Sequence, residues 1–311
     1  MKALVTGGAG FIGRWVVNRL LEEKAEVWVL DDLSNGDETN LSEFTGTGNY
    51  HGLIKGDVAN IKCVAGLFQN KYDICIHAAA QINVQESLDN PEKAFRTNLV
   101  GTYNVLSCAL KTDAKVVLIG TCMVYDMAQA GAISELWHVK PTSPYAGSKL
   151  AAENLALSYY YGFGLPVVIL RPFNTYGPFQ KTNMEGGVVS IFIKNQIDGE
   201  GLRIFGDGTQ TRDLLYVEDC ADFIVRAACS GKVVGQIINA GAGRDISIND
   251  LALLISKDPG KIQHVKHHHP QSEIPKLLCD SSKARELLGW EPQTSLEEGI
   301  QKTERWLRAR Y

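Results

Sequence analysis

A tyrosine and a lysine four residues apart are the side chains in this sequence best suited to acid–base chemistry. They are Tyr145 and Lys149, in the stretch SPYAGSKLAAEN. Residues i and i+4 of a helix share a face, so the ammonium would lie near the phenol and lower its pKa. A phenolate held in this way can remove a proton from a hydroxyl group. The spacing is common on helices, and it predicts a general base at Tyr145 only in a suitable context.

A short polar stretch, GTCMVYD, follows the apolar run KVVLI and is typical of a loop at the end of a buried strand. Thr121 can hydrogen-bond well, and Met123 can neither donate nor accept a proton. Cys122 has a reference pKa of about 8.5 and can act as an acid or base only if its surroundings tune it. Packing is the alternative role of Cys122. The three residues therefore restrict which reactions the loop can support.

A glycine-rich turn lies near the start of the chain, where the strand-like run KALVTGG leads into VTGGAGFIG. Gly7, Gly10 and Gly13 are spaced three residues apart, and Phe11 and Ile12 open the helix-like segment that follows. Residues without a Cβ atom permit a tight turn, close approach of a pyrophosphate, and close packing of helix on strand. The pattern predicts a dinucleotide site on these five residues. An ordinary glycine-rich turn is the alternative.

An acidic residue at the end of the next strand-like run favours the dinucleotide interpretation. Asp31 lies about twenty residues after the glycines, where a carboxylate would hold the adenosine ribose hydroxyls. The same charge disfavours a 2′-phosphate, so the sequence predicts NAD rather than NADP. Asp32 is adjacent and could share or exchange this role.

Two further strand ends contribute candidate cofactor contacts. Asp57 ends the run KGDV, beside Val58, and could either reach the adenine edge or cap the next helix. Ala78, Ala79 and Ala80 end the run YDICIHAAA, where small side chains would let a cofactor lie close to the backbone. Tight packing is the alternative explanation for the three alanines.

The segments that position these residues alternate in the first half of the chain. KALVTGG, EVWVLDD, LIKGDV, YDICIHAAA, KVVLIGT and PVVILRPF have the composition of short buried strands. Helices are predicted at 11–22, 91–111 and 145–161. Apolar strands alternating with helices predict a parallel sheet covered on both faces, which is the doubly wound α/β arrangement of a Rossmann-type fold.

The character of the sequence changes beyond residue 174, where glycine, proline and polar residues interrupt it. Helices are predicted at 218–229 and 249–256, and the final stretch SLEEGIQKTERWLRAR predicts an amphipathic helix with Ser295 as N-cap. The simplest architecture has a cofactor-binding domain at 1–173 and a smaller α/β part at 174–311 that binds substrate, with crossovers of the chain between them. A substrate would lie between the two, outside the carboxyl ends of the strands.

The composition excludes several classes of protein. The 311 residues are 45% hydrophobic and 21% charged, which is typical of a globular protein with a substantial core, and the formal net charge is −4. That charge argues against a nucleic-acid or anionic-membrane partner, and no apolar run approaches the length of about 20 residues that a membrane helix needs. The seven cysteines contain no CxxC pair, and no signal-peptide pattern opens the chain. We expect a disulfide-free cytoplasmic protein.

Taken together, these motifs resemble the extended short-chain dehydrogenase/reductase family, and within it the nucleotide-sugar epimerases and dehydratases. The resemblance covers nearly the whole chain and rests on VTGGAGFIG, LDDLSNG, HAAA, TNLVGTYNVL, SPYAGSK, LRPFNTYGP, FGDGTQTRDLLYVEDC and SKARELLGWEP. It implies NAD as cofactor and a nucleotide-diphosphate sugar as substrate. It also implies a homodimer built on the helices predicted at 91–111 and 145–161.

The resemblance assigns roles to individual residues. Thr121 matches the residue that hydrogen-bonds the reacting sugar hydroxyl, and Tyr145 matches the base. Lys149 matches its partner, which also holds the nicotinamide ribose. Asn98 matches a residue near the cofactor that orders the active site.

The second half of the chain supplies the expected nucleotide contacts. Asn174 and Arg212 match groups that hold the substrate diphosphate, a task that suits the planar fork of a guanidinium. A surface ion pair with Asp213 or Asp207 is the alternative role of Arg212. The residues expected to line the nucleotide pocket are Val188, Val189 and Phe205.

The sequence departs from the family pattern at two places. Where the family has an RPGD-like stretch whose arginine also grips the diphosphate, this chain has HHHPQSEIPK, with Pro270 or Gln271 near that place. His267–His269 could supply donor contacts instead. Consecutive histidines alternate in direction and no carboxylate pattern accompanies them, so a solvated loop is favoured over a metal site. Asp126 replaces the usual glycine after VY.

The triplet Thr121-Cys122-Met123 favours one reaction of the family over the others. Both candidate reactions begin with oxidation at C4 of the sugar, with Tyr145 taking the hydroxyl proton. A 4,6-dehydratase of the family then uses an Asp-Glu pair at the positions of Cys122 and Met123, whereas a 4-epimerase needs neither group. We therefore predict a 4-epimerase acting on a UDP-type sugar.

Three alternatives remain open from the sequence. An atypical 4,6- or 5,6-dehydratase comes second, because a branch of the family carries Thr-Cys-Glu and a base could come from elsewhere, such as Glu185. A decarboxylase is disfavoured because it too relies on a glutamate in the triplet. A non-catalytic NAD-binding sensor is a further alternative, and the intact Thr121, Tyr145 and Lys149 argue against it.

Overall fold

The computed structural model describes residues 1–126, 131–182, 187–266 and 274–310, and a seven-stranded parallel sheet forms the larger part of what it describes. The strand order is β10-β6-β5-β4-β1-β2-β3, and each neighbouring pair runs parallel. The expected Rossmann-type fold class is confirmed. The strands of this sheet are β1 (Lys2–Thr6), β2 (Glu26–Asp31), β3 (Tyr50–Lys55), β4 (Ile74–His77), β5 (Lys115–Ile119), β6 (Val167–Pro172) and β10 (Ile237–Ala240).

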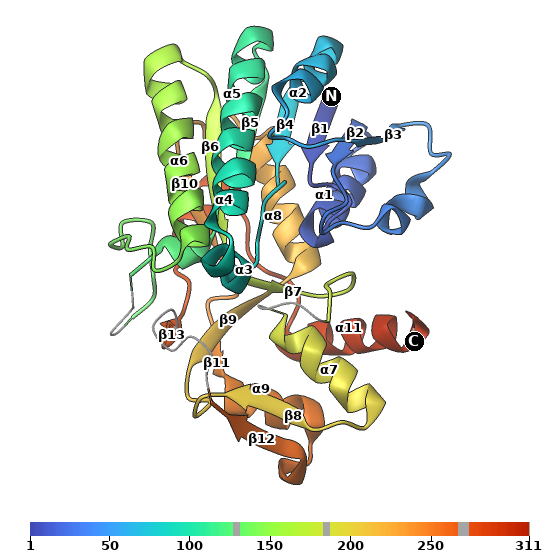
Figure 1. The fold of residues 1–311 in the computed structure, drawn as a ribbon, viewed down its shortest axis with the longest axis vertical. Helices are drawn as coiled ribbons and strands as arrows, with labels where there is room; N and C mark the ends of the chain where they lie inside the picture. The colour runs from blue at the N-terminus through green and yellow to red at the C-terminus, as the bar shows by residue number, and fades with distance from the viewer. Residues whose placement is uncertain (127–130, 183–186, 267–273, 311) are drawn as a thin grey trace.

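Helices cover both faces of the sheet, as the ribbon shows (Figure 1). Successive residues of β5 point to opposite faces, so Val117 and Ile119 join the core under one helical layer while Val116 and Leu118 join the other. Two helices form the first layer: α1 (Phe11–Glu22) and α8 (Val217–Cys229). The opposite layer consists of α2 (Ile61–Leu67), α5 (Gly101–Thr112) and α6 (Pro144–Phe163).

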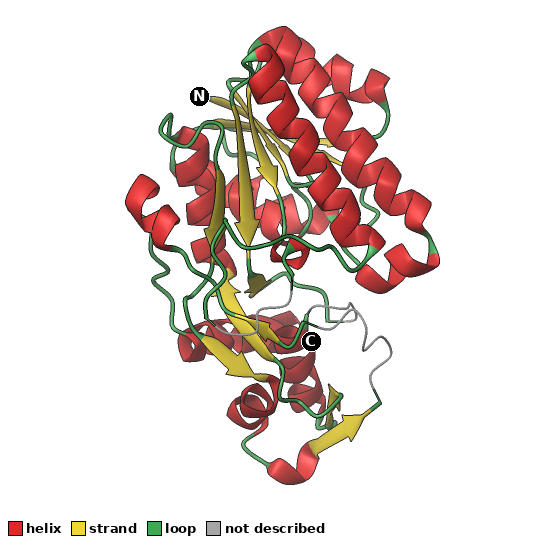
Figure 2. Cartoon of the chain, turned by 90° about the vertical axis from the view of Figure 1, so that its left-hand side faces the viewer, coloured by secondary structure: helices red, strands yellow, loops and turns green. Residues whose placement is uncertain are grey.

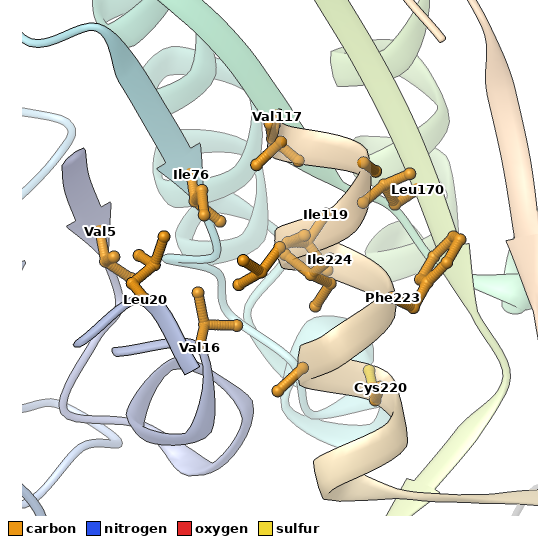
Figure 3. Close-up of a cluster of buried hydrophobic side chains, with 14 of the residues drawn as sticks. Val5, Val16, Leu20, Ile76, Val117, Ile119, Leu170, Cys220, Phe223 and Ile224 are labelled. Carbon is orange, nitrogen blue, oxygen red and sulfur yellow. The ribbon is translucent and has the colours of Figure 1, made fainter. Parts of the chain in front are cut away.

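The core under α1 and α8 is built from aliphatic side chains of the strands and one face of each helix (Figure 3). Val16 and Leu20 of α1 lie one helical turn apart and face Val5, and Phe223 and Ile224 of α8 cover the other half of the same core. Because the central strands β4, β5 and β6 are buried on both faces, their apolar runs in the sequence are continuous rather than alternating.

Short helical segments lie in the connections, and all of them except η2, which continues α2, follow the carboxyl end of a strand. The helix predicted at 91–111 is interrupted, because its residues 95–100 widen into a π-helix between two α-helical parts. The segments are η1 (Glu38–Phe44), η2 (Phe68–Asn70), α3 (Val84–Asp89), α4 (Pro91–Ala94), the π-helix η3 (Phe95–Val100) and η4 (Cys122–Val124).

A smaller part with its own core follows the large sheet (Figure 2). Strand β9 (Thr211–Tyr216) is central to it and pairs with β7 (Asn174–Tyr176), β11 (Asp245–Ser247) and β13 (Lys276–Leu277). A separate two-stranded ladder joins β8 (Leu202–Phe205) to β12 (Ile262–Val265). The helices of the smaller part are α7 (Val188–Asp198), α9 (Ile248–Ser256), η5 (Pro259–Lys261) and α11 (Leu296–Arg310), whereas α10 (Ser282–Leu288) packs against β10 and α8 of the large sheet.

The chain crosses between the two parts more than once. Strand β10 pairs with β6 and α8 packs against α1, so both elements belong to the large sheet although they follow β7, β8 and β9 in the sequence. Among the described residues, no helix is both long enough and apolar enough to span a membrane.

Candidate active site

A cavity of about 1140 Å³ lies where the carboxyl ends of the large sheet's strands meet α7, β8 and β9. This volume exceeds that of most small-ligand pockets and suits two ligands side by side. Most of the residues singled out from the sequence line its wall: Gly7, Gly10, Phe11, Ile12, Gly13, Asp31, Asp32, Val58, Ala78, Ala79, Ala80, Thr121, Cys122, Met123, Tyr145, Lys149, Asn174, Val188, Phe205 and Arg212. Within the described residues, three candidates lie off this wall: Asp57, Asn98 and Val189.

The glycine turn has a geometry that a side chain would destroy. Gly7 has a φ of +73°, and a Cβ atom there would lie 2.6 Å from the amide nitrogen of Ala79. A Cβ atom on Gly13 would overlap the carbonyl oxygen of Gly7. The turn is thus closed tightly on the end of β4, and it leaves backbone N–H groups at the start of α1 facing the cavity, where an anionic pyrophosphate would bind.

Asp31 is held at the cavity wall by both of its carboxylate oxygens. Oδ2 accepts the N–H of Ala9 at 2.9 Å, and Oδ1 accepts the N–H of Leu33 at 2.9 Å. Burial raises the pKa of this carboxyl, although the two backbone donors oppose the shift. Asp32 is exposed and turns back onto its own loop, where Oδ1 accepts hydrogen bonds from the backbone and hydroxyl of Ser34. Asp31 is therefore the better placed of the two carboxylates.

Asp57 has a local role, but it is not the helix cap that the sequence offered as an alternative, because Asn60 is the N-cap of α2. Its Oδ1 accepts the N–H of Ala59 at 2.7 Å, which closes the turn before α2. In the part of the chain that is described, Val58 lines the cavity wall and Asp57 does not. A short carboxylate that bonds the backbone two residues ahead is a common turn device, and the sequence could not separate it from a ligand contact.

A directed chain of hydrogen bonds runs through the buried His77 at the end of β4. The hydroxyl of Thr102 donates to the carbonyl of Asn98 at 2.6 Å, so its oxygen accepts from His77 Nε2 at 3.1 Å. His77 Nδ1 is then the acceptor for the hydroxyl of Thr6 at 2.7 Å, whose oxygen in turn accepts the N–H of Ala79 at 3.3 Å. Burial lowers the pKa of His77 to about 3, so the imidazole is neutral. The chain ties the three-alanine loop to the π-helix.

Asn98 continues this network toward α6. Its Oδ1 accepts the N–H of Gln81 at 2.8 Å, and its Nδ2 donates to Gln81 O at 3.1 Å and to Ser148 Oγ at 2.9 Å. The side chain is buried, so these bonds fix the loop after β4 relative to α6. Asn98 thus orders the site although its own side chain does not line the cavity.

The start of α6 sets the position of Tyr145. Ser143 caps the helix by accepting the N–H of Ala146 at 3.2 Å, and Pro144 occupies the first helical position. The backbone N–H of Tyr145 donates to Ser87 Oγ at 3.1 Å, and its hydroxyl hydrogen-bonds with Thr121.

Lys149 lies one turn after Tyr145, and its Nζ donates to the carbonyl of Ile119 at 2.5 Å. Three candidate residues from two distant segments, Thr121, Tyr145 and Lys149, thus meet in the cavity.

Burial dominates the ionisation of the pair. It raises the pKa of Tyr145 to about 12 and lowers the pKa of Lys149 to about 8. The expected lowering of the tyrosine pKa is therefore wrong for the chain's own groups, because desolvation disfavours the phenolate more strongly than the hydrogen bond with Thr121 favours it.

Cys122 and Met123 lack the properties of an acid–base pair. The thiol of Cys122 is 3% exposed and lies 3.9 Å from Asn174 Oδ1, and burial raises its pKa to about 12. It therefore remains a neutral thiol near neutral pH. Met123 lines the cavity with its thioether. Glu185, considered as an alternative base, lies outside the described residues.

The far end of the cavity is formed by α7, β8 and β9. Val188 and Phe205 line it, whereas Val189 turns into the core of the smaller part and is 1% exposed. Consecutive residues of a helix point about 100° apart, so one of two adjacent valines must leave the cavity. The sequence could not decide which one.

Arg212 is braced at this end by backbone carbonyls. Its Nη1 donates to Thr211 O at 2.7 Å and to Ile274 O at 2.8 Å. Asp213, offered as an alternative partner, is buried and accepts the N–H groups of Ala242, Gly243 and Cys279.

Asp207, the other alternative partner, accepts the N–H of Thr209 at 3.0 Å. Pro270, Gln271 and His267–His269 lie outside the described residues. Among the described residues, no group of three or more His, Cys, Asp or Glu side chains is placed to hold a metal ion.

The cavity wall also contains polar residues that the sequence did not single out. Gln81 is buried, its amide donates to Asn83 O at 2.7 Å and to Glu86 Oε2 at 3.2 Å, and its own oxygen has no partner within the described structure. Glu86 in turn accepts from Lys93 Nζ at 2.5 Å. The position of Gln81 directly after HAAA was the available signal, since a polar residue that follows a buried strand faces the same cavity.

Comparison with known proteins agrees with this geometry. The model of the NAD dependent epimerase/dehydratase family matches residues 3–241. A UDP-glucose 4-epimerase of Mycolicibacterium smegmatis is 36% identical over 311 residues, 99% of each chain. The crystal structure of Pal from Bacillus thuringiensis is 59% identical over the whole of both chains, with a TM-score of 0.98. DesIV, a dTDP-glucose 4,6-dehydratase of Streptomyces venezuelae solved with NAD and TYD bound, is 30% identical, with a TM-score of 0.93 over 99% of this chain and 97% of its own.

The chain belongs to the NAD dependent epimerase/dehydratase family. The residues present fit an NAD molecule, because the positive φ of Gly7 and the close contact of the turn with Ala79 leave a cradle that a side chain would fill. Asp31 and Lys149 lie at the wall of the same cavity, where they would hold the two riboses. NAD is the cofactor of this enzyme.

Proposed function

We propose that this enzyme is a nucleotide-sugar 4-epimerase. The observation that carries the proposal is the triplet beside Tyr145, in which Thr121 supplies a hydroxyl while Cys122 is a buried neutral thiol and Met123 is apolar. Elimination from a 4-keto sugar needs a base for the C5 proton, and neither residue can serve as that base. The resemblance to the UDP-glucose 4-epimerase of M. smegmatis supports the same conclusion.

The chain's own groups account for the proton transfers. Tyr145 removes the proton of the sugar 4-hydroxyl and later returns it, and Thr121 holds the same oxygen through a hydrogen bond. Lys149, one turn away, favours the phenolate by its charge and would hold the nicotinamide ribose. When bound, NAD would supply the acceptor and donor of the hydride at C4. Inversion at C4 then requires only that the keto sugar turn over, a motion that an uncharged wall at Cys122 and Met123 does not obstruct.

The substrate's remaining contacts follow from the division of the chain. We assign 1–173 mainly to the cofactor and 174–311 mainly to the nucleotide sugar. Asn174 and Arg212 would hold the diphosphate, and Val188 and Phe205 would contact the nucleoside, since all four line the far end of the cavity. The two carbonyls that bond Arg212 hold its guanidinium at this end of the cavity, and the planar fork of that group suits a diphosphate.

An atypical 4,6- or 5,6-dehydratase is the second candidate. Glu86 places a carboxylate on the cavity wall, and this chain is also similar to DesIV, which is a dTDP-glucose 4,6-dehydratase. The carboxylate of Glu86 is, however, paired with Lys93 and hydrogen-bonded by Gln81, and these contacts lower its pKa and weaken it as a base.

An isotope experiment separates the two reactions. The purified protein is incubated with UDP-glucose and with other UDP- and TDP-sugars in D₂O, and the products are followed by NMR. A 4-epimerase inverts C4 and leaves C5 unlabelled, because the C5–H bond is never broken. Deuterium at C5, or loss of the 6-hydroxyl, would refute the epimerase assignment and support the dehydratase.

We also propose a homodimer and a cytoplasmic location. Large apolar side chains are exposed on the segment from η3 to α6, and they include Phe95, Tyr103, Tyr161 and Phe163. Large apolar side chains exposed on neighbouring helices favour burial against a second copy. The described cysteines are all free and most are buried, which favours a reducing compartment. Light scattering at several concentrations tests the dimer.

A further inference from the structure

A buried ion pair lies behind Lys149 and has no part in the proton transfers described above. Glu153 follows Lys149 by four residues on α6, and Arg171 lies on β6. Arg171 Nη2 donates to Glu153 Oε2 at 2.6 Å, and Nε donates to the same carboxylate at 3.1 and 3.2 Å. The side chains are 3% and 1% exposed. Removing two charges from water is costly, so a pair in this position calls for a specific explanation.

One side of the pair packs directly under the backbone that leads to Thr121. A Cβ atom on Gly120 would overlap Glu153 Oε1 and would lie 3.2 Å from Arg171 Cγ. The N–H of Gly120 donates to Leu170 O at 2.6 Å, which continues the β5–β6 ladder to the last residue before the triplet. The carboxylate of Glu153 therefore fills the space below the loop that carries Thr121.

The other side of the pair is held by the segment that follows the triplet. The ring of Tyr125 lies over the guanidinium of Arg171, with 4.7 Å between the guanidinium carbon and the ring centroid. The hydroxyl of Tyr125 donates to Asn239 Oδ1 at 2.7 Å, and Asn239 lies beside Arg171 in the β6–β10 ladder. The ion pair thus connects α6, β6 and both ends of the Thr121 loop.

The charges around Lys149 give this arrangement an electrostatic consequence. Glu153 from α6 and His77 from β4 interact electrostatically with Lys149, and Tyr145 lies one turn before it on α6. Cys122 from η4 faces Tyr145, and Arg171 from β6 faces Glu153. His77 is neutral, because burial lowers its pKa to about 3, and Cys122 is neutral, because burial raises its pKa to about 12. Among the described residues, Glu153 is therefore the group that balances two buried cations.

We infer that the Arg171–Glu153 pair is a positioning device, which keeps the Lys149 ammonium charged beside Tyr145 and braces the backbone of Gly120 and Thr121. The inference rests on the proposed function for its catalytic meaning. Its physical content, the effect of the pair on Lys149, can be measured without any turnover.

The two members of the pair act on Lys149 with opposite sign. Replacing Glu153 with Gln leaves two buried cations that repel each other. Loss of the Lys149 proton removes this repulsion, because the Arg171 guanidinium keeps its own proton. Lys149 then loses its proton at lower pH. Replacing Arg171 with Gln leaves Glu153 to interact with Lys149 alone, so Lys149 keeps its proton to higher pH. A role confined to packing would not give two shifts of opposite direction.

The test is a titration of Lys149 in the whole protein with NAD bound. The ¹³Cε signal of labelled lysine is followed against pH by NMR and assigned by its loss in Lys149→Met. We expect the midpoint to fall by about one pH unit or more in Glu153→Gln and to rise by a similar amount in Arg171→Gln. Shifts in the same direction, or no shift, would overturn the inference.

Activity and folding supply the remaining controls. The alkaline limb of the kcat profile should move with the Lys149 midpoint while KM for the nucleotide sugar changes little. If a single variant does not fold, the double variant Glu153→Leu/Arg171→Met replaces the pair by apolar side chains, which buried pairs often tolerate. Its Lys149 midpoint should lie below that of the wild type, and an equal midpoint would contradict the role. A wild type that turns over no nucleotide sugar would refute the proposed function and leave the titration result standing.

Discussion

Replacing Tyr145 with Phe isolates the proposed base from the rest of the site. The ring is buried at the wall of the cavity, and Phe keeps its shape and its contacts. The substitution removes one oxygen atom, which hydrogen-bonds with Thr121. The backbone N–H bond to Ser87 and the capping of α6 by Ser143 do not involve that oxygen. The variant should therefore fold and bind NAD normally.

The expected loss is far larger for catalysis than for stability. Losing a general base lowers turnover by roughly 10²- to 10⁴-fold, which corresponds to about 2.7–5.5 kcal/mol at 1.36 kcal/mol per tenfold. Losing one side-chain hydrogen bond lowers the free energy of unfolding by about 1 kcal/mol. The ratio of these two effects is the signature of a catalytic residue. A residue that merely packs would show the reverse.

Tyr176→Phe is the matched control, because it removes the same atom from another buried tyrosine. The hydroxyl of Tyr176 donates to Leu296 O at 3.3 Å, and among the described residues it is not part of the cavity wall. Turnover of UDP-glucose and thermal unfolding are measured for both variants at several pH values. Near-full activity of Tyr145→Phe, or equal losses in the two variants, would refute the proposed mechanism.

Three further predictions concern the cofactor and the reaction. Gly7→Ala should weaken NAD binding by at least about tenfold, because its Cβ would press on the Ala79 amide at a φ of +73°, whereas Gly46→Ala, also at positive φ but with open space around it, should bind NAD normally in calorimetry. NAD should bind at least about 100-fold more tightly than NADP, because Asp31 repels a 2′-phosphate, and equal affinities would contradict that role. Cys122→Ala should keep turnover within about tenfold of the wild type, and a larger loss without a loss of stability would show that the thiol takes part in the chemistry.

Local patterns were sufficient to predict six of the seven strands of the large sheet, β1 to β6. The helix predicted at 11–22 is present as Phe11–Glu22, directly after the glycine turn, and the helix predicted at 145–161 is present as Pro144–Phe163. These local patterns act within a few residues of the chain, so they can be recognised from the sequence without knowledge of the fold. The pairing of the glycine turn with Asp31 is predictable for the same reason, since one βαβ unit contains both.

Non-local packing decided what the patterns left open. The sequence predicts one helix at 91–111, whereas the structure widens residues 95–100 into a π-helix that presents Asn98 to the loop after β4. Strand β10 belongs to the large sheet because it pairs with β6, about 65 residues earlier in the chain, and no local signal encodes a partner at that distance.

The sequence by itself determined which groups are candidates for the chemistry, and the tertiary structure decided their ionisation and direction. The spacing of Tyr145 and Lys149 predicted a lowered tyrosine pKa, yet burial raises it to about 12, because desolvation depends on every element packed around the ring. Tertiary structure also decided the roles of Asp57 and Val189, neither of which lines the cavity. Asp57 accepts the backbone N–H of Ala59, and Val189 packs into the core of the smaller part. A residue's type fixes what it can donate or accept, whereas its solvent exposure and its neighbours are properties of the folded chain.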